Sequence, residues 1–222
     1  MKLLRSALTL ALLIVPVATA LATQRVDVVP VPPGTPIQKM TIGSPNVDEC
    51  GLVYDNTSNF TGYFYDAGAG TQAADDLHMI SGGNLCRFDF AYYKGSMGTT
   101  DATVTIYAND PSDNPPVVVV AGPYVLAALP GAGAYMAGVA VTPVAVPPDV
   151  WIGVSFSTAG TGLLTMDPPT IGTSDDFFFV TPPGEYAFFG GNPAANFAFA
   201  VHAAIATPTR PSTWGSVKQL YR

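Results

Sequence analysis

The chain has 222 residues, of which 48% are hydrophobic and 11% are charged, and its formal net charge is -7. A surface dominated by carboxylates repels phosphate backbones, so the composition argues against a nucleic-acid partner. The 22 glycines and 21 prolines, together with very few Glu and Lys residues, indicate a chain rich in turns and poor in helices.

Residues 1–22 have the order of a secretory signal peptide. Lys2 and Arg5 precede an apolar core from Ala7 to Val15, and Ala20-Leu21-Ala22 offers small residues for cleavage. The alternative, an uncleaved membrane anchor, is weaker because this core is shorter than the roughly 20 residues that a bilayer span needs. We therefore expect a secreted protein, extracellular or on the cell surface, with no transmembrane span in the mature chain.

Residues 23–40 contain four prolines and are interpreted as an extended, loosely ordered lead-in. The domain is expected to span residues 41–206. Short apolar runs alternate there with Gly, Pro, Asn and Asp clusters, at nearly the spacing of an all-β sandwich or barrel. The predicted strands are 51–55, 61–65, 76–80, 84–94, 102–108, 117–127, 134–146, 150–157, 162–166, 176–181, 185–189 and 196–206.

Several of these runs alternate with the period of two that is typical of strands. Val104 and Ile106 share one face of their run, while Thr103 and Thr105 share the other. The long Gly- and Pro-rich connectors favour crossings between sheets over simple hairpins. The fold predicted is all-β, a two-sheet antiparallel sandwich that resembles a jelly roll.

Cys50 and Cys86 are the only cysteines. In an oxidising compartment an even pair most often forms a disulfide, which we predict here. Two separate buried thiols are the alternative.

The last residues, 207–222, change character and form a Pro linker with a basic end. Trp214, Val217 and Tyr221 have helical spacing, and Lys218 adds charge beside them. We interpret this segment as a short sorting or docking tag defined by Trp214, Lys218 and Tyr221. A frayed terminus with one docked aromatic side chain is the alternative.

Two pairs of adjacent aspartates stand near apolar runs, Asp75-Asp76 and Asp175-Asp176. Calcium takes six to eight oxygen ligands from such loops, so these four residues and Asp55 are candidate ligands of a structural Ca²⁺. Asp at a strand entry also caps a turn by accepting a backbone N–H, which explains each pair separately. Only convergence of the two pairs in space would require an ion.

Catalytic signals are weak. His78 and His202 are 124 positions apart and lie in strand patterns, so we interpret both as structural and expect neither a zinc site nor a catalytic base. A glycosidase needs two carboxylates at a set separation, and no spacing singles out such a pair. The prediction is a non-enzymatic protein, with a hydrolase that uses an Asp pair as an alternative.

Aromatic side chains are plentiful, and exposed rings on a flat sheet could stack on sugar faces. Tyr63, Tyr65 and Tyr93 are the candidate ligand-binding residues for such a role. Packing of these rings between the sheets is the competing interpretation.

The fragments "VYDNTSNFTGYFYDAGAGTQAADDLHM", "FDFAYY", "ATVTIYAND", "MDPPTIGTSDDFF" and "FFGGNPAANFAFAV" resemble a group of exported bacterial β-sandwich proteins. Many members of that group carry PEP-CTERM-type or other interchangeable C-terminal anchors. The likeness covers about residues 50–206 and implies a secreted or surface-displayed sandwich without an established reaction. The hydrophobic anchor has no counterpart here, where the tail "TWGSVKQLYR" resembles a short tag.

The sequence therefore predicts an exported, non-enzymatic β-sandwich module with a structural or binding role, whose partner is a polysaccharide or another component of the envelope or matrix. A lectin-like carbohydrate-binding domain with a structural calcium ion is the second hypothesis.

Overall fold

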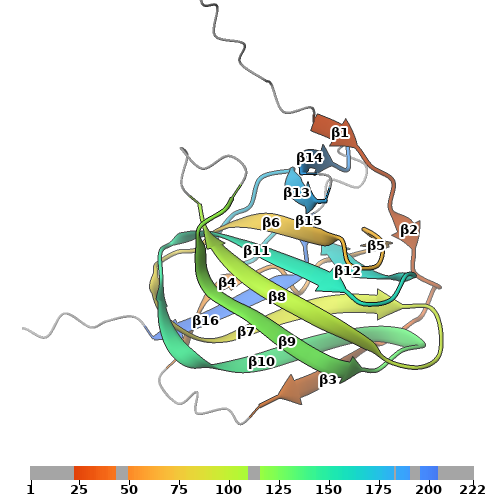
Figure 1. The fold of residues 1–222 in the computed structure, drawn as a ribbon, viewed down its shortest axis with the longest axis horizontal. Helices are drawn as coiled ribbons and strands as arrows, with labels where there is room; N and C mark the ends of the chain where they lie inside the picture. Colours follow the sequence, from red (N-terminus) through yellow and green to blue (C-terminus); the bar gives the residue numbers. More distant parts are fainter. Residues whose placement is uncertain (1–22, 44–49, 110–115, 183, 191–195, 205–222) are drawn as a thin grey trace, which may run out of the picture.

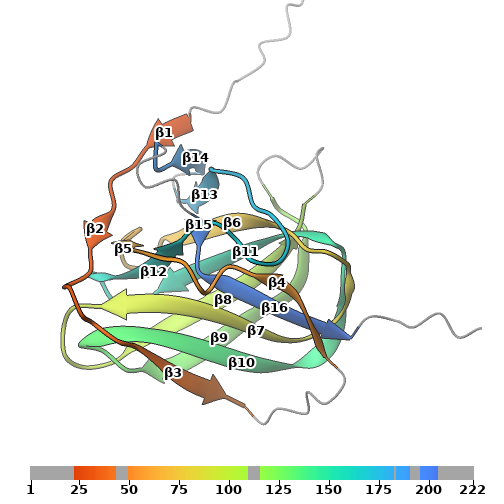
Figure 2. The same ribbon diagram turned by 180° about the vertical axis from the view of Figure 1, so that it is seen from behind.

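The computed structural model describes residues 23–43, 50–109, 116–182, 184–190 and 196–204. All regular structure in these residues is β-strand, in two sheets that pack face to face (Figures 1 and 2). The all-β sandwich predicted from the sequence is confirmed. The predicted signal peptide and the Trp214, Lys218 and Tyr221 tag lie outside the described residues.

The first sheet has seven strands in the order β1-β14-β13-β6-β11-β8-β9. Its members are β1 (Thr23–Arg25), β14 (Glu185–Phe188), β13 (Phe178–Thr181), β6 (Gln72–His78), β11 (Asp149–Phe156), β8 (Thr100–Ala108) and β9 (Val119–Leu129).

The second sheet has nine strands, with the central order β2-β5-β12-β7-β10-β3, while β15 pairs with β12 and β16 joins β7 to β4. Its members are β2 (Val29–Pro30), β5 (Phe60–Tyr65), β12 (Thr161–Met166), β7 (Gly83–Lys94), β10 (Gly133–Val146), β3 (Ile37–Ile42), β15 (Asn196–Phe197), β16 (Phe199–Ala204) and β4 (Gly51–Asp55). Among the described strands, consecutive ones pair only at β8–β9 and β13–β14, as the connectors predicted.

The core lies between the sheets and is formed by the inward side chains of alternating strands. Phe88, Phe90 and Tyr92 of β7 are fully buried in it, as are Val104 of β8 and Ile152 of β11. Burial of each such side chain contributes roughly 1.5–3 kcal/mol, so this layer supplies most of the stability. Arg87 and Asp89, at the alternate positions of β7, therefore face outward.

Residues 23–42 differ from the expected loose lead-in, because they contribute three strands to the two sheets. β1 pairs with β14 and β3 pairs with β10, both in parallel, and β2 pairs with β5. The sandwich is therefore not strictly antiparallel. Pro30 fits β2 because this strand lies at the edge of its sheet, where one side of the backbone needs no partner.

Strand β6 begins at Gln72, four residues before the predicted start, so Asp75 and Asp76 lie inside it. The sequence pattern placed them at the strand entry because Asp is depleted in strands. Long-range hydrogen bonds to both carboxylates, described below, override that preference.

Cys50 and Cys86 form the predicted disulfide, with their Cα atoms 6.6 Å apart. The bond connects the residue before β4 to β7, and β16 runs between those two strands. It closes a loop with a sequence separation of 36 residues.

Replacing both cysteines by serine is expected to lower the free energy of unfolding by about 2–4 kcal/mol, because the open chain gains conformational entropy when it unfolds. Denaturant unfolding of the variant and of the oxidised protein measures the difference. The same midpoint for both would contradict a stabilising role of the bond.

Candidate metal centre

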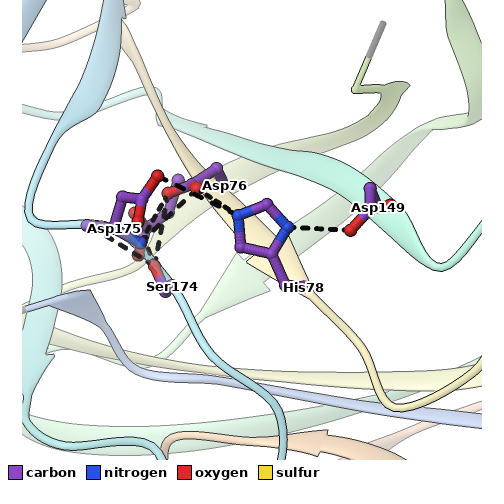
Figure 3. A network of polar contacts seen from close by, with 6 residues as sticks. Asp76, His78, Asp149, Ser174 and Asp175 are labelled. Carbon is purple, nitrogen blue, oxygen red and sulfur yellow. Dashed lines mark hydrogen bonds and ion pairs between the residues drawn. The ribbon is translucent and has the colours of Figure 1, made fainter.

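One aspartate from each predicted pair meets a histidine at one end of the seven-stranded sheet. A ligand atom from each of Asp76, His78 and Asp175 lies within 4.8 Å of the other two. Figure 3 shows the three side chains together, with Ser174 and Asp149 on either side. We call Asp76, His78 and Asp175 the metal-site triad.

Strand geometry places the first two members. Asp76 and His78 are two positions apart on β6, so their side chains project from the same face of the sheet. His78 Nε2 lies 3.1 Å from Asp76 Oδ2. Asp75, between Ala74 and Asp76, projects from the opposite face.

The third member comes from the segment that connects β12 to β13. Thr173 in this segment exchanges two backbone hydrogen bonds with His78, with N–O distances of 2.8 and 3.0 Å. The backbone N–H of Asp175 then donates to the Asp76 carboxylate at 3.2 Å. Its own carboxylate reaches 4.0 Å from His78 Nε2.

Asp149 fixes the orientation of the imidazole ring. It begins β11 directly opposite His78 in the strand register, and its Oδ1 lies 2.7 Å from His78 Nδ1. A carboxylate only accepts, so Nδ1 carries a proton and donates it to Asp149. In the neutral ring, Nε2 faces Asp76 and Asp175 with the lone pair that a metal ion could accept. In the protonated ring, Nε2 instead pairs with Asp76 Oδ2 at 3.1 Å.

Electrostatics at the site favour protons on the carboxylates when no cation is bound. Burial, and after it the charge of Asp175, raises the pKa of Asp76 to about 6. Burial and then the charge of Asp76 raise the pKa of Asp75 as well. For His78, burial lowers the pKa, but the hydrogen bond to Asp149 and the nearby carboxylates outweigh it and raise the pKa overall.

Hydrogen bonds compensate part of this burial. Asp75 and Asp76 are each only 1% exposed. Asp75 Oδ2 accepts the backbone N–H of Phe197 at 2.8 Å, and the Ser174 hydroxyl lies 3.3 Å from Asp76 Oδ1. No equally strong positive charge accompanies them, since His78 is the only basic residue in an ion pair with either carboxylate among the described residues.

An aromatic cluster borders the site on the same face of the sheet. Trp151 lies opposite Asp76 in the register, and its ring is 5.9 Å from Phe177 and 6.1 Å from Tyr186. Asp76 is 1% exposed beside this cluster, and the low local polarity strengthens the electrostatic interactions of its carboxylate.

The five aspartates predicted as metal ligands therefore divide into four groups. Asp76 and Asp175 belong to the triad, and Asp75 lies behind it without joining. Asp55 is a turn residue, because its Oδ1 accepts the Thr57 N–H at 3.0 Å and its Oδ2 accepts the Thr170 hydroxyl at 2.7 Å. Asp176 is exposed and outside the triad.

His78 lies in strand β6, as the sequence pattern predicted, but the fold also brings it into a group that could hold a metal ion, which the sequence pattern did not predict. A signal for it existed in the Asp-x-His spacing, which puts both side chains on one face of a strand. Asp149 and Ser174 had no such signal, since each meets His78 or Asp76 only through the fold.

The three candidate sugar-stacking tyrosines do not form one surface. Tyr65 belongs to the main core, with its ring centre 5.0 Å from that of Phe178. Tyr93 packs at 4.8 Å against Phe64 in a separate cluster. Tyr63 is partly buried on β5. Packing explains two of these rings better than ligand stacking does.

No helix in the part of the chain that the structure describes is long and apolar enough to cross a membrane. Comparison of the chain with known protein families, with curated proteins and with solved structures finds no match. The resemblance to exported β-sandwich proteins therefore stays a prediction.

The pKa shifts predict that the metal-free protein loses stability as the pH rises. A folded-state pKa above the unfolded value contributes stability that is complete below the unfolded value and is lost as the pH rises through the folded one. For Asp76 this window runs from 3.8 to about 6 and corresponds to about 3 kcal/mol at most. Asp75 and His78 act in the same direction.

Urea unfolding in the presence of a chelator, from pH 4.5 to 7.5, measures this dependence. Asp76→Asn should flatten it, since the amide has no charge to bury. An equally steep curve for this variant would show that other groups are responsible.

Proposed function

We propose that this chain is an exported, non-enzymatic β-sandwich module that binds a divalent transition-metal ion such as Zn²⁺ at the metal-site triad. Its role is structural or binding, at the cell surface, in the matrix or in the envelope. The observation that carries the metal assignment is the Asp149–His78 hydrogen bond, which turns the Nε2 lone pair toward two carboxylates.

The spacing of the triad suits a small ion. Zinc bonds to nitrogen and oxygen at about 2.0–2.2 Å, which puts neighbouring ligands of a tetrahedral site about 3.4 Å apart. The separations from His78 Nε2 to Asp76 and Asp175, 3.1 and 4.0 Å, lie on either side of that value. The exposed carboxylate of Asp175 can adjust, and water completes the fourth position.

The donor set favours a transition metal over the calcium ion expected from the sequence. Calcium takes six to eight oxygen ligands, whereas the triad offers one imidazole nitrogen and two carboxylates. Imidazole suits Zn, Cu, Fe and Ni. A carboxylate that accepts from the second ring nitrogen is the usual companion of a metal-bound histidine.

Such an ion would stabilise the end of the sandwich. It would neutralise the Asp76 and Asp175 carboxylates and would connect β6 to the segment between β12 and β13. Because the ion binds only the folded arrangement, its binding free energy adds to the stability of the fold.

Export is supported by the predicted signal peptide together with the Cys50–Cys86 disulfide. Disulfides persist in oxidising compartments and are rare in the cytosol of most organisms.

Calorimetric titration of the chelator-treated protein tests the metal site. Zn²⁺ is expected to bind at one site per chain and much more tightly than Ca²⁺. His78→Gln should abolish this binding, and Asp149→Asn should weaken it about 10–100-fold because the ring loses its orientation.

Two neighbouring aspartates provide a matched control. Asp175→Asn removes a ligand and should weaken Zn²⁺ binding, whereas Asp176→Asn removes the same charge one residue away and should leave it unchanged. If both variants weakened Zn²⁺ binding equally, the effect would come from the overall charge of the region, and the triad would be contradicted.

Turnover on a panel of glycans and esters that disappears in Asp76→Asn would overturn the non-enzymatic assignment.

A further inference from the structure

A pocket of about 270 Å³ lies on the outer face of the nine-stranded sheet, on the opposite side of the sandwich from the metal-site triad. Its floor is where β3, β10 and β7 run side by side, nearest the viewer in Figure 2. The lining residues are Lys39, Met40, Thr41, Thr57, Ser58, Arg87, Asp89 and Met136.

An Arg–Asp pair forms one wall of this pocket. Arg87 Nε donates to Asp89 Oδ1 at 2.6 Å and Nη2 donates to Oδ2 at 3.0 Å. Burial raises the pKa of Asp89, but His202 and Arg87 outweigh it and lower the pKa overall, so the carboxylate stays charged at neutral pH. A guanidinium has five N–H donors, and these two bonds leave three for a ligand.

Gly138 makes room for the pair. It lies opposite Asp89 in the register, and a Cβ atom there would come within 2.5 Å of Arg87 Nη2 and 2.9 Å of Asp89 Oδ1. Any side chain at position 138 would therefore displace the Arg87 guanidinium from its place over strand β10. The position of Arg87 in the pocket thus depends on a residue without a side chain.

Lys39 adds a second positive charge, and it forms no ion pair with any described residue. Lys39, Arg87 and Asp89 together give the pocket a charge of +1 in a chain whose net charge is -7. A local positive charge with unused donors is suited to one carboxylate of a ligand.

The other lining groups indicate what surrounds that carboxylate. Thr41 and Ser58 contribute hydroxyl groups that can both donate and accept. The Thr57 hydroxyl donates to Asp55 Oδ1 at 2.6 Å, so it can only accept from a ligand, as Asp89 does. Met136 adds an apolar surface for C–H groups. The volume is close to the lower end of the range for small-molecule sites, which suits a ligand the size of one sugar ring.

We propose that this pocket binds a hydroxyl-rich carboxylate, a uronic acid unit. Lys39 and the free edge of Arg87 bind its carboxylate, while the Ser, Thr and Asp89 oxygens bind its ring hydroxyls. The site is independent of the metal-site triad, because the two lie on opposite faces and share no residue.

Three small probes separate the parts of this assignment in titrations of the purified protein at low salt. D-Galacturonate carries both a carboxylate and hydroxyls, D-galactose lacks the carboxylate, and acetate lacks the hydroxyls. Galacturonate is expected to bind in the millimolar range. The other two probes should bind at least about tenfold more weakly, because galactose lacks the charge-assisted hydrogen bonds of the carboxylate and acetate lacks the hydrogen bonds of the hydroxyls. The affinity for polygalacturonate, expressed per sugar unit, is then compared with the affinity for free galacturonate. This comparison shows whether the site prefers a polymer or a free sugar acid, and binding of either form supports the site.

Lys39→Ala should weaken galacturonate binding about tenfold, because it removes a charge-assisted hydrogen bond from an exposed position where the fold is not at risk. Gly138→Ala should weaken it without any change of charge, by displacing Arg87. Arg25→Ala, on β1 of the other sheet, removes the same charge as Lys39→Ala and should have no effect.

Equal loss in Lys39→Ala and Arg25→Ala would overturn the assignment, as would acetate or galactose binding as tightly as galacturonate. Absence of galacturonate binding at tens of millimolar would overturn it too. A change in metal affinity is not expected in any of these variants.

Discussion

The candidate metal centre depends on one short backbone contact, the pair of hydrogen bonds between His78 and Thr173. Through this contact the segment between β12 and β13 runs beside the end of β6. Asp175 is two residues beyond Thr173, so its amide and its carboxylate both come into reach of Asp76 and His78. Without the contact, Asp175 would not come into reach of Asp76 and His78.

The cost of this arrangement is the burial of negative charge. Asp75 and Asp76 are nearly inaccessible, and an unpaired buried carboxylate is strongly unfavourable. Backbone donors from Phe197 and Asp175 and the partly exposed His78 compensate only in part, as the raised pKa of Asp76 shows. Binding of a proton or of a divalent cation would remove the remaining penalty, because either one neutralises the buried charge. Asp89 differs from Asp75 and Asp76 in this respect, because the positive charge of Arg87 already balances its carboxylate.

Much of the fold could be predicted from local sequence alone. The alternation of Val104 and Ile106 with threonines, and of Phe197, Phe199 and Val201 with small residues, marks strands that the structure contains. The strands at 23–42 could not be predicted in this way, because their stability comes from edge pairing with β14, β5 and β10 rather than from a pattern of their own.

The site was only half predictable for a related reason. Adjacent aspartates at 75–76 and 175–176 signalled an unusual density of charge. One member of each pair, Asp76 and Asp175, converges in the structure, whereas the calcium hypothesis called for convergence of both pairs. The role of His78 depends on Asp149, which is 71 residues away in the sequence and adjacent only through the strand register. Long-range pairing of this kind decides which carboxylate joins the triad, which stabilises a turn and which is exposed.

The central claim is that one metal ion is bound by His78 and by one aspartate of each pair. A crystal structure of the zinc-soaked protein tests it most directly, with anomalous diffraction recorded on both sides of the zinc absorption edge. We predict a single strong anomalous peak about 2.0–2.2 Å from His78 Nε2 and from one oxygen each of Asp76 and Asp175. The His78–Asp149 hydrogen bond should be unchanged. Density that shows His78 hydrogen-bonded directly to Asp76, with no peak between the three residues, would contradict the account.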